Sequence, residues 1–310
     1  MKYDILSAGI TLVEMPRKEF DVPFDEIGEF VGPFPSADTC IMIDTAARLG
    51  CNCCWLGAFG NDPFSNILRN RLESDGVDLS HCKTLPEYQT RVTFVRYNRD
   101  GSREYLTNKS SDSEKNFGED YVDSDVISQA KWIHFSGEII TLFSDEKRRA
   151  GLLKMLNSIT PEQKVSLDPN DGWPADAKEI IQPFVERADL ILPSEGEART
   201  LMGVATDEEA CQRWASEGKI VALKRGHEGC DIYSNNDVIH VDPFHVTSVD
   251  PTGCGDSFCA GFITGLIREL NLAEIGRLAN ACGALQATKM GPMEGSMPWS
   301  TVEKFIEENR

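Results

Sequence analysis

Short apolar runs alternate with amphipathic stretches along most of the chain. The runs have the length of β-strands, and the apolar residues between them recur at helical spacing. This alternation predicts an α/β fold, in which helices cover both faces of a mostly parallel sheet. The predicted strands are Tyr3–Ala8, Trp55–Phe59, Lys131–Phe135, Lys164–Leu167, Asp189–Leu192 and Ile220–Leu223.

Capping residues, proline and glycine indicate where the helices begin and end. Thr39–Leu49 has helical periodicity, and Asn61 or Asp62 can cap a helix that has Pro63 in its first turn and runs to about Ser74. The C-terminal third is mainly helical, with predicted helices at Gly253–Leu270, Ala273–Lys289 and Trp299–Glu308.

Two regions interrupt the alternation. Gln89–Asn98 and Ser102–Leu106 are strand-like and flank Arg99-Asp100-Gly101, which is a hairpin turn signal. Glu19–Val31 also has an extended pattern and contains Pro23. We predict that these regions form a small β-sheet projecting from the main sheet.

The chain is expected to form one domain, residues 1–310. The small sheet would be built from two segments inserted in it, approximately 12–36 and 86–110. A second hairpin, at Ile232–Val241, is predicted within the core.

The net charge of the chain argues against some classes of binding partner. The 310 residues include 31 basic and 50 acidic side chains, a formal net charge of −19. A field of this sign repels nucleic acid and anionic lipid, so neither is an expected partner. It does not exclude a phosphate-bearing ligand, because backbone N–H groups and a single lysine can bind phosphate inside an acidic protein.

Targeting signals and cysteine usage predict a cytoplasmic protein. The N-terminus lacks the features of a signal peptide, and no run approaches the roughly 20 apolar residues that span a bilayer. The ten cysteines are expected to be reduced there. Cys51 and Cys54 form a C-x-x-C, but no second ligand pair suits a structural zinc site.

The clearest chemical signal is Asp250-Pro-Thr-Gly-Cys-Gly-Asp256, directly before a helical stretch. Glycines let the backbone approach a ligand closely, and the N–H groups of a helix N-terminus suit an anion. Phosphoryl transfer needs such donors for the charge on the transferring group. A carboxylate beside the same turn, Asp256, could accept the proton of the attacking hydroxyl.

This segment resembles the C-terminal signature of the PfkB, or ribokinase-like, carbohydrate kinase family, Asp-Thr-x-Gly-Ala-Gly-Asp. Pro251-Thr252 and Cys254 are departures from that pattern. Five further segments resemble the family in the same order, namely Ala47–Ser65, Asp168-Pro169-Asn170, Pro193–Ala198, Lys224–Gly229 and Ala279–Gly291.

The resemblance implies a three-layer α/β/α core with a small β-lid over a sugar. It also implies Mg-ATP, often a monovalent cation such as K⁺ near the anion hole, and dimers in many members, here through the lid. Asp256 would be the general base, and the backbone of Gly253, Cys254 and Gly255 the anion hole. Asp250 could shape the cation loop or simply cap it.

On the nucleotide side the resemblance assigns Glu197, the acidic member of an N-x-x-E motif, to Mg²⁺ through water. Ser194 replaces the asparagine of that motif, and Ser194 with Glu197 also fits a capping box.

The nucleotide pocket itself would be lined by Lys224, Gly226 and Gly229, or these residues form a turn between two strands. Asn280 could contact adenine or ribose, although a lone helical asparagine more often bonds locally.

The sugar side departs most from the family. The segment before the first helix lacks the usual Gly-Gly pair, and Asp38 could supply the polar contact or cap the helix. Glu14 lies where the family often has an acidic residue that holds sugar hydroxyls. Phe94 and Tyr105 could cover the sugar or pack the lid, and Asn170 is another candidate. Weaker candidates are Arg91, Arg103 and Lys109.

We therefore expect ATP-dependent phosphoryl transfer to a hydroxyl of a sugar or sugar-like molecule, similar to the reactions of ribokinase, fructokinase or 2-keto-3-deoxygluconate kinase. Two alternatives stay open. One is a nucleoside kinase on the same fold. The other is a non-catalytic sugar- or nucleotide-binding regulatory protein, motivated by the altered Gly-Gly and N-x-x-E segments.

Overall fold

A computed structural model gives the structure of the chain. It describes residues 1–86, 89–99, 102–107, 118–142, 146–170 and 177–309. Lys109, the predicted turn at Asp100-Gly101 and part of the segment 86–110 therefore lie outside the described residues.

The centre of the molecule is an eight-stranded sheet in the order β14-β13-β12-β11-β10-β9-β1-β4. The six strands from β12 to β4 run parallel, and β13 and β14 extend the sheet as an antiparallel hairpin. The strands are β1 (Tyr3–Ala8), β4 (Cys53–Leu56), β9 (Ala130–Ser136), β10 (Lys164–Asp168), β11 (Leu190–Ile191), β12 (Ile220–Lys224), β13 (Cys230–Ser234) and β14 (Asp237–Val241).

Side chains on both faces of the parallel strands are buried because helices cover both faces of the sheet. Consecutive residues such as Ile5 and Leu6, which point to opposite faces, are both fully buried, as are Leu190 and Ile191. This explains why these strands appear in the sequence as continuous apolar runs instead of alternating ones.

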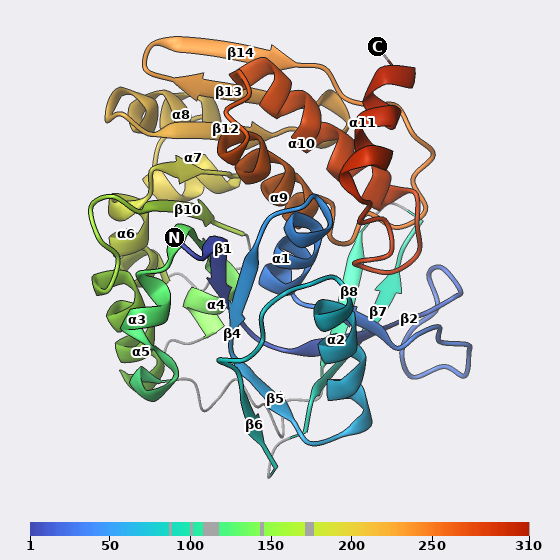
Figure 1. Ribbon diagram of the computed structural model, residues 1–310. Coiled ribbons are helices and arrows are strands. Elements are labelled where there is room, and N and C mark those ends of the chain that lie inside the picture. The colour runs from blue at the N-terminus through green and yellow to red at the C-terminus, as the bar shows by residue number, and fades with distance from the viewer. Residues whose placement is uncertain (87–88, 100–101, 108–117, 143–145, 171–176, 310) are drawn as a thin grey trace.

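Helices form a layer on each face (Figure 1). α1, α9, α10 and α11 pack on one another in that order on one side, and α3, α5, α6 and α8 lie on the other. The helices are α1 (Asp38–Arg48), α2 (Pro63–Ser74), α3 (Ser124–Ile127), α4 (Gly137–Leu142), α5 (Glu146–Asn157), α6 (Ala177–Arg187), α7 (Glu197–Met202), α8 (Asp207–Ser216), α9 (Cys254–Ile267), α10 (Leu272–Ala287) and α11 (Trp299–Glu308), with 3₁₀ turns at Glu119–Tyr121 and Gly226–Glu228. Within the described ranges, no helix is both long and apolar enough to cross a bilayer.

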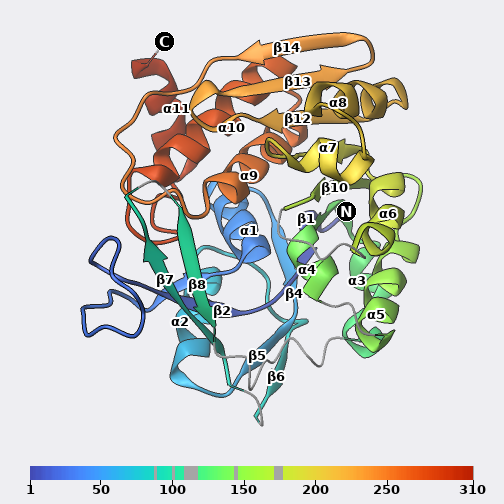
Figure 2. The same cartoon turned by 180° about the vertical axis from the view of Figure 1, so that it is seen from behind.

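A separate four-stranded sheet stands beside the main one, in the order β3-β2-β7-β8 (Figure 2). Its strands are β2 (Leu12–Pro16), β3 (Phe34–Ser36), β7 (Arg91–Tyr97) and β8 (Arg103–Thr107). The predicted small sheet is thus confirmed, and its strands fall within the two predicted segments. The prediction that Glu19–Val31 contributes a strand was wrong. This region is a loop between β2 and β3, with one bridge between Arg17 and Phe30.

A second correction concerns Trp55–Phe59, which is not one strand. β4 ends at Leu56, and after Gly57 the chain forms β5 (Ala58–Gly60), which pairs with β6 (Lys83–Leu85) away from the main sheet. A Cβ atom on Gly57 would lie 2.2 Å from the Trp55 ring, so the break needs glycine.

The sheet topology fixes where a ligand site can form. From β1 the chain adds β4 on one side and then β9 on the other, so the strand order reverses at β1. Ligands of open α/β sheets bind beyond the carboxyl ends of the strands at such a reversal. The small sheet faces this edge.

We predict that Asp62→Ala lowers the free energy of unfolding by about 1–2 kcal/mol. Asp62 caps α2 by accepting a hydrogen bond from Ser65 N (2.9 Å), and it also accepts one from Thr90 N (2.6 Å), next to β7. Urea unfolding measures the change. Glu73→Ala, an exposed change in the same helix, is the control and should stay within about 0.5 kcal/mol of wild type. Equal effects of the two changes would contradict the capping role.

Candidate active site

Two cavities adjoin at the N-terminus of α9. One, of about 530 Å³, lies between the main-sheet edge and the small sheet, and we call it the acceptor cavity. The other, of about 680 Å³, lies between the β12–β13 turn and helices α9 and α10, and we call it the donor cavity. Both are lined by Ser194, Lys224, Pro251 and Gly255. Two ligands could therefore meet at this shared wall.

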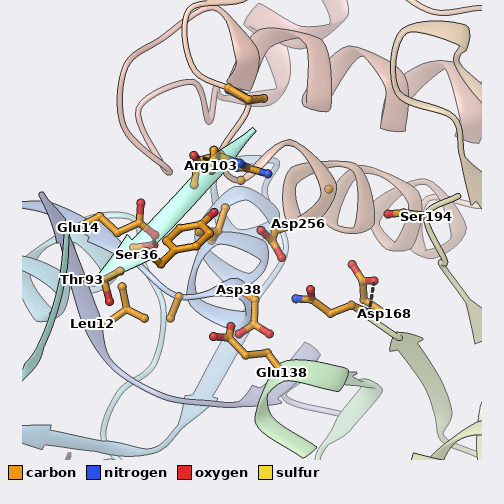
Figure 3. A pocket seen from close by; sticks show the side chains of 18 of the residues that line it. Leu12, Glu14, Ser36, Asp38, Thr93, Arg103, Glu138, Asp168, Ser194 and Asp256 are labelled. Carbon is orange, nitrogen blue, oxygen red and sulfur yellow. Dashed lines mark hydrogen bonds between the residues drawn. The ribbon is translucent and has the colours of Figure 1, made fainter. Parts of the chain in front are cut away.

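The acceptor cavity collects acidic side chains from the carboxyl ends of neighbouring strands. Glu14 follows β1 and lies on β2, Glu138 is the second residue of α4, two residues past β9, and Asp168 ends β10. Asp38 enters from the first residue of α1 and Asp256 from the first turn of α9. Figure 3 shows these carboxylates around one space.

Asp38, Glu138 and Asp256 are close enough to influence one another's charge. Burial raises the pKa of Asp38 to about 6, even though it accepts hydrogen bonds from Ser136 Oγ and Thr39 N. Burial and the nearby Asp38 raise the pKa of Glu138 well above its usual range. Burial also raises the pKa of Asp256, and the Asp38 and Asp168 carboxylates raise it further. A raised pKa makes Asp256 a stronger proton acceptor once it is ionised.

One carboxylate oxygen of Glu14 accepts a hydrogen bond, and the other has no partner among the described residues. Oε1 accepts a hydrogen bond from Ser36 Oγ (2.8 Å), whereas the buried Oε2 receives none from any described residue. Burial raises the pKa of Glu14 to about 7. A buried polar atom usually has a partner, so a ligand hydroxyl in the cavity is a natural donor to Oε2.

A buried ion pair forms part of the shared wall. Lys224 Nζ lies 2.7 Å from Asp168 Oδ2, and Cys259 Sγ lies 3.2 Å from the same oxygen. Burial opposes the charge on Lys224, but Asp168 outweighs it and raises the pKa of Lys224. Lys224 therefore keeps its positive charge between the two cavities.

The donor cavity has a glycine turn at one end and apolar walls at the other. Gly226 and Gly229 have positive φ angles of 53° and 87°, and a Cβ on Gly229 would lie 2.1 Å from Val241 O. Phe244, Val246, Phe258, Ala284 and Ala287 line the cavity further along. These surfaces suit a flat apolar ring, with the charged end of the ligand toward Gly255.

The turn before α9 presents the helix N-terminus to this junction. Gly253 is its N-cap in a left-handed conformation, φ 80°, and a Cβ there would lie 2.2 Å from Pro292 O. No side chain caps the helix. The N-terminal N–H groups of the 14-residue helix are thus directed at the place where the two cavities meet, and they suit an anion.

Comparisons with known proteins agree with this geometry. Residues 42–300 match the model of the pfkB family carbohydrate kinases. The chain belongs to the pfkB family of carbohydrate kinases. It is 31% identical to a probable fructokinase-4 of Arabidopsis thaliana, over 98% of this chain and 97% of that protein. It is 29% identical to a fructokinase-2 of Solanum lycopersicum, over 93% and 91%.

Solved structures of the family support the fold. A putative ribokinase II from E. coli in complex with ATP and Mg²⁺ superposes with a TM-score of 0.91, 31% identity and 99% coverage of both chains. A fructokinase from Vibrio cholerae has a TM-score of 0.80 at 23% identity, covering 99% and 100%. The predicted family, fold and enzyme class, an ATP-dependent carbohydrate kinase, are confirmed.

The kinase fold brings most of the predicted site residues to the two cavities. In the acceptor cavity the structure places Glu14, Asp38, Arg91, Arg103, Tyr105, Asn170, Ser194, Glu197, Gly253, Gly255 and Asp256. In the donor cavity it places Lys224, Gly226, Gly229, Cys254 and Asn280, together with Ser194 and Gly255 again.

Phe94 is a correction. It lies on β7 between Thr93 and Val95, and side chains alternate between the faces of a strand, so it points away from the cavity that Thr93 lines. Its ring packs edge-to-face on Phe30, with centroids 5.1 Å apart. These contacts agree with the alternative prediction for Phe94, that it packs within the small sheet.

Asn280 bonds to the end of β14, and Ser194 bonds within its own turn. Asn280 Nδ2 donates to Val241 O and Asp242 O, both at 3.0 Å, although the residue still lines the donor cavity. Glu197 Oε2 accepts from Ser194 N at 2.7 Å, which is the reach-back half of a capping box. The N-cap of α7 is Gly196, however, so the predicted box with Ser194 as the cap is wrong.

Asp250 is fully buried and holds the turn in place. Its Oδ1 accepts hydrogen bonds from Tyr97 OH and Thr252 N, both at 2.9 Å, and its Oδ2 accepts one from Gly291 N at 3.0 Å. Tyr97 belongs to β7, and Arg103 of β8 donates to Thr252 Oγ1 (3.2 Å). The small sheet is thus bonded directly to the turn that precedes α9.

Sequence reasoning missed Glu138 and the pairing of Lys224 with Asp168. Glu138 stands two residues beyond β9, and an acidic residue just past the end of a parallel strand is a usable signal. The Lys224–Asp168 contact joins residues 56 positions apart, and only the strand order shows it.

We predict that Glu14→Gln changes how stability depends on pH. Folded Glu14 keeps its proton up to a pKa of about 7, whereas the ordinary value is 4.5. The folded state therefore binds more protons in this window, and wild type loses stability as the pH rises through it. Relative to wild type, Glu14→Gln should gain about 2 kcal/mol between pH 5.5 and 8.0 in urea unfolding. A pH-independent difference would show that Glu14 is ionised throughout.

Proposed function

We propose that this kinase transfers the γ-phosphoryl group of ATP to a hydroxyl of an unphosphorylated sugar, with Asp256 as the general base. The observation that supports this most is the position of Asp256. It projects into the acceptor cavity from the first turn of α9, beside Gly255, which lines both cavities.

Each cavity would hold one substrate. The apolar walls of the donor cavity suit adenine, and its phosphates would lie toward Gly255, where the N–H groups at the start of α9 stabilise negative charge. A sugar hydroxyl beside Asp256 would give its proton to that carboxylate as its oxygen attacks the γ-phosphorus, while the bond from that phosphorus to the β,γ-bridging oxygen breaks and ADP leaves. Lys224, charged and on the shared wall, would offset the charge of the transferring group.

Mg²⁺ would enter with ATP. Within the described ranges, no cluster of three or more His, Cys, Asp or Glu side chains could hold a metal alone. Mg²⁺ prefers phosphate oxygens and water with one or two carboxylates. We propose Glu197 for such a contact, because its Oε2 accepts a hydrogen bond from the backbone N–H of Ser194, which lines both cavities. Bound there, Mg²⁺ would neutralise phosphate charge.

The charges around the acceptor cavity favour an uncharged polyol. Glu14, Asp38, Glu138 and Asp256 can each accept hydrogen bonds from hydroxyls, but they would repel a sugar acid or sugar phosphate. Arg91 and Arg103 also line the cavity, where Arg91 lies near Glu138 and Arg103 donates to Thr252. Because the curated relatives include fructokinases, fructose is the first sugar to test.

We predict that Asp256→Asn lowers kcat by at least about 100-fold, because the amide cannot accept the hydroxyl proton. ATP affinity should change less than about threefold, since the helix N-terminus is unaltered. Coupled ADP release with Mg-ATP and fructose measures kcat, and calorimetry measures ATP binding. Asp237→Asn, on the exposed β13–β14 hairpin, is the control and should match wild type. Full activity of Asp256→Asn would reject the assigned base.

The same assay decides the acceptor class. Its panel contains fructose, other hexoses, pentoses, keto-deoxy sugar acids, sugar phosphates and nucleosides. Turnover restricted to nucleosides would replace the sugar proposal by a nucleoside kinase. Turnover with sugar phosphates or sugar acids would show that the arginines, and not the carboxylates, dominate recognition. Binding of ATP and sugar without turnover would indicate a regulatory protein.

We also propose a cytoplasmic homodimer. Cytoplasmic thiols stay reduced, which suits a chain whose ten cysteines are all unpaired. β8 is an edge strand of the small sheet, and its Tyr105 and Leu106 are 53% and 51% exposed. Exposed strand edges with apolar side chains favour pairing with a second copy.

We predict that wild type has twice the 34.4 kDa chain mass in light scattering and that Leu106→Asp is monomeric, because two buried aspartates would repel each other. Val238→Asp is a matched control, since Val238 is also 51% exposed and lies on an edge strand, β14 of the main sheet. It should stay dimeric. A monomeric wild type, or dissociation by both variants, would contradict pairing through the small sheet.

A further inference from the structure

A fully buried glutamine joins the two loops behind the N-terminus of α9. Gln286, on the last turn of α10, has no exposed surface. Its Nε2 donates to Thr252 O at 3.0 Å and to Gly291 O at 2.8 Å, and its Oε1 accepts from Gly295 N at 2.9 Å. One side chain thus bridges the loop before α9 and the loop after α10.

The neighbours fix the orientation of this carboxamide. If its oxygen and nitrogen were exchanged, Oε1 would face two carbonyl oxygens and the NH₂ group would face an N–H donor. Both contacts would be repulsive, and buried polar atoms without partners are costly. The NH₂ group therefore points at the two carbonyls, one of which belongs to the residue directly before the N-cap Gly253.

Convergent carbonyl oxygens are the ligands of which K⁺ sites in proteins are made. The resemblance to the family implied a monovalent cation near this turn, with Asp250 as a candidate ligand. The residues present do not fit such an ion. Asp250 accepts hydrogen bonds from Tyr97 OH, Thr252 N and Gly291 N. Ala287 O likewise accepts from Val249 N and Asp250 N.

We propose that the NH₂ group of Gln286 takes the place of a cation between the carbonyl oxygens of Thr252 and Gly291. Its two N–H donors hold these carbonyls together, so this kinase needs no K⁺. The inference rests on the proposed phosphoryl transfer, because Gln286 acts as a positioning residue for the turn that leads into α9. It touches neither cavity. Its effect reaches the reaction only through the placement of Thr252, Gly253 and the first N–H groups of the helix.

The first test uses the wild-type enzyme. Coupled turnover of Mg-ATP and the accepted sugar is measured in 100 mM KCl, NaCl or choline chloride, at equal ionic strength. The rates should agree within twofold. Activation by K⁺ of more than threefold over choline would overturn the proposal.

The second test removes the amide. In Gln286→Ala the two carbonyls lose their donor and face a space that a cation can enter. We expect kcat in choline chloride to fall at least tenfold, with at least a fivefold recovery in KCl. The thermal midpoint of the variant should rise by several degrees in KCl relative to choline chloride, because an ion that binds only the folded state stabilises it.

The chain offers a matched control for this loss. Gln163 is also fully buried, and its Nε2 donates to Ile127 O and Ala130 O, both at 2.7 Å, while its Oε1 accepts from Thr160 N. Gln163→Ala loses an equivalent set of hydrogen bonds, and Gln163 lines neither cavity. It should be destabilised without any K⁺ response of kcat. Equal K⁺ responses of the two alanine variants, or none in Gln286→Ala, would overturn the assignment.

A second variant guards against misfolding of Gln286→Ala. Gln286→Glu keeps the shape but replaces the donors by a carboxylate at high pH. It should be inactive in choline chloride at pH 8, partly active at pH 6, where a protonated acid can donate once, and activated by K⁺ at pH 8. A K⁺-insensitive Gln286→Glu would contradict the proposal. The thermal measurements need no turnover, so they decide the ion question even if no tested sugar is phosphorylated.

Discussion

The active-site geometry depends on how the turn before α9 is held. A helix N-terminus stabilises a transferring phosphoryl group only if its N–H groups are already in place. Here the Asp250 carboxylate and the Gln286 carboxamide bind that turn to the loop after α10. All of these bonds are buried, where hydrogen bonds are stronger than in water and expensive to leave unmade. The glycines can then keep the open conformation that ligand approach needs.

The second organising feature is an excess of carboxylates around a small space. Burial raises the pKa values of Asp38, Glu138 and Asp256, and neighbouring carboxylates raise them further. Lys224 pairs with Asp168 and also lowers the pKa of Asp256, but burial and the neighbouring carboxylates outweigh this effect. The cavity is therefore prepared for groups that donate hydrogen bonds, and a polyol supplies many. Burial and the nearby carboxylates keep the pKa of Asp256, in the first turn of α9, above its usual range.

The sequence predicted the layers of the fold well because its strong signals are local. Apolar runs predicted the parallel strands, and of the two candidate caps for α2, Asn61 and Asp62, the structure shows Asp62. It failed at Glu19–Val31, which is a loop with one bridge from Phe30 to Arg17, and at Gly57, where one apolar run contributes strands to two sheets. In both places the outcome depends on which strand lies alongside, and a local pattern does not contain that information.

The site was predictable to a similar degree. Asp256 and the glycines form one contiguous motif, so the sequence could predict that they lie together at one cavity. Glu138, the Lys224–Asp168 pair and the amide bridge of Gln286 arise from contacts between distant segments. The two alternatives for Phe94 could not be separated from the sequence, because the face on which a strand residue lies depends on register. Physical chemistry gave the types of group needed, and the topology decided which residues supply them.

The bonds from the small sheet to the α9 turn have a thermodynamic meaning. Tyr97 and Arg103 connect strands that wall the acceptor cavity to Asp250 and Thr252, and thus to the platform on which the phosphates of ATP would rest. A sugar that orders these strands also orders that platform, so each substrate lowers the conformational entropy that the other must lose. By thermodynamic linkage the effect is mutual. Binding of the two substrates would be synergistic, and water, which cannot order the sheet, would be a poor substitute for the sugar.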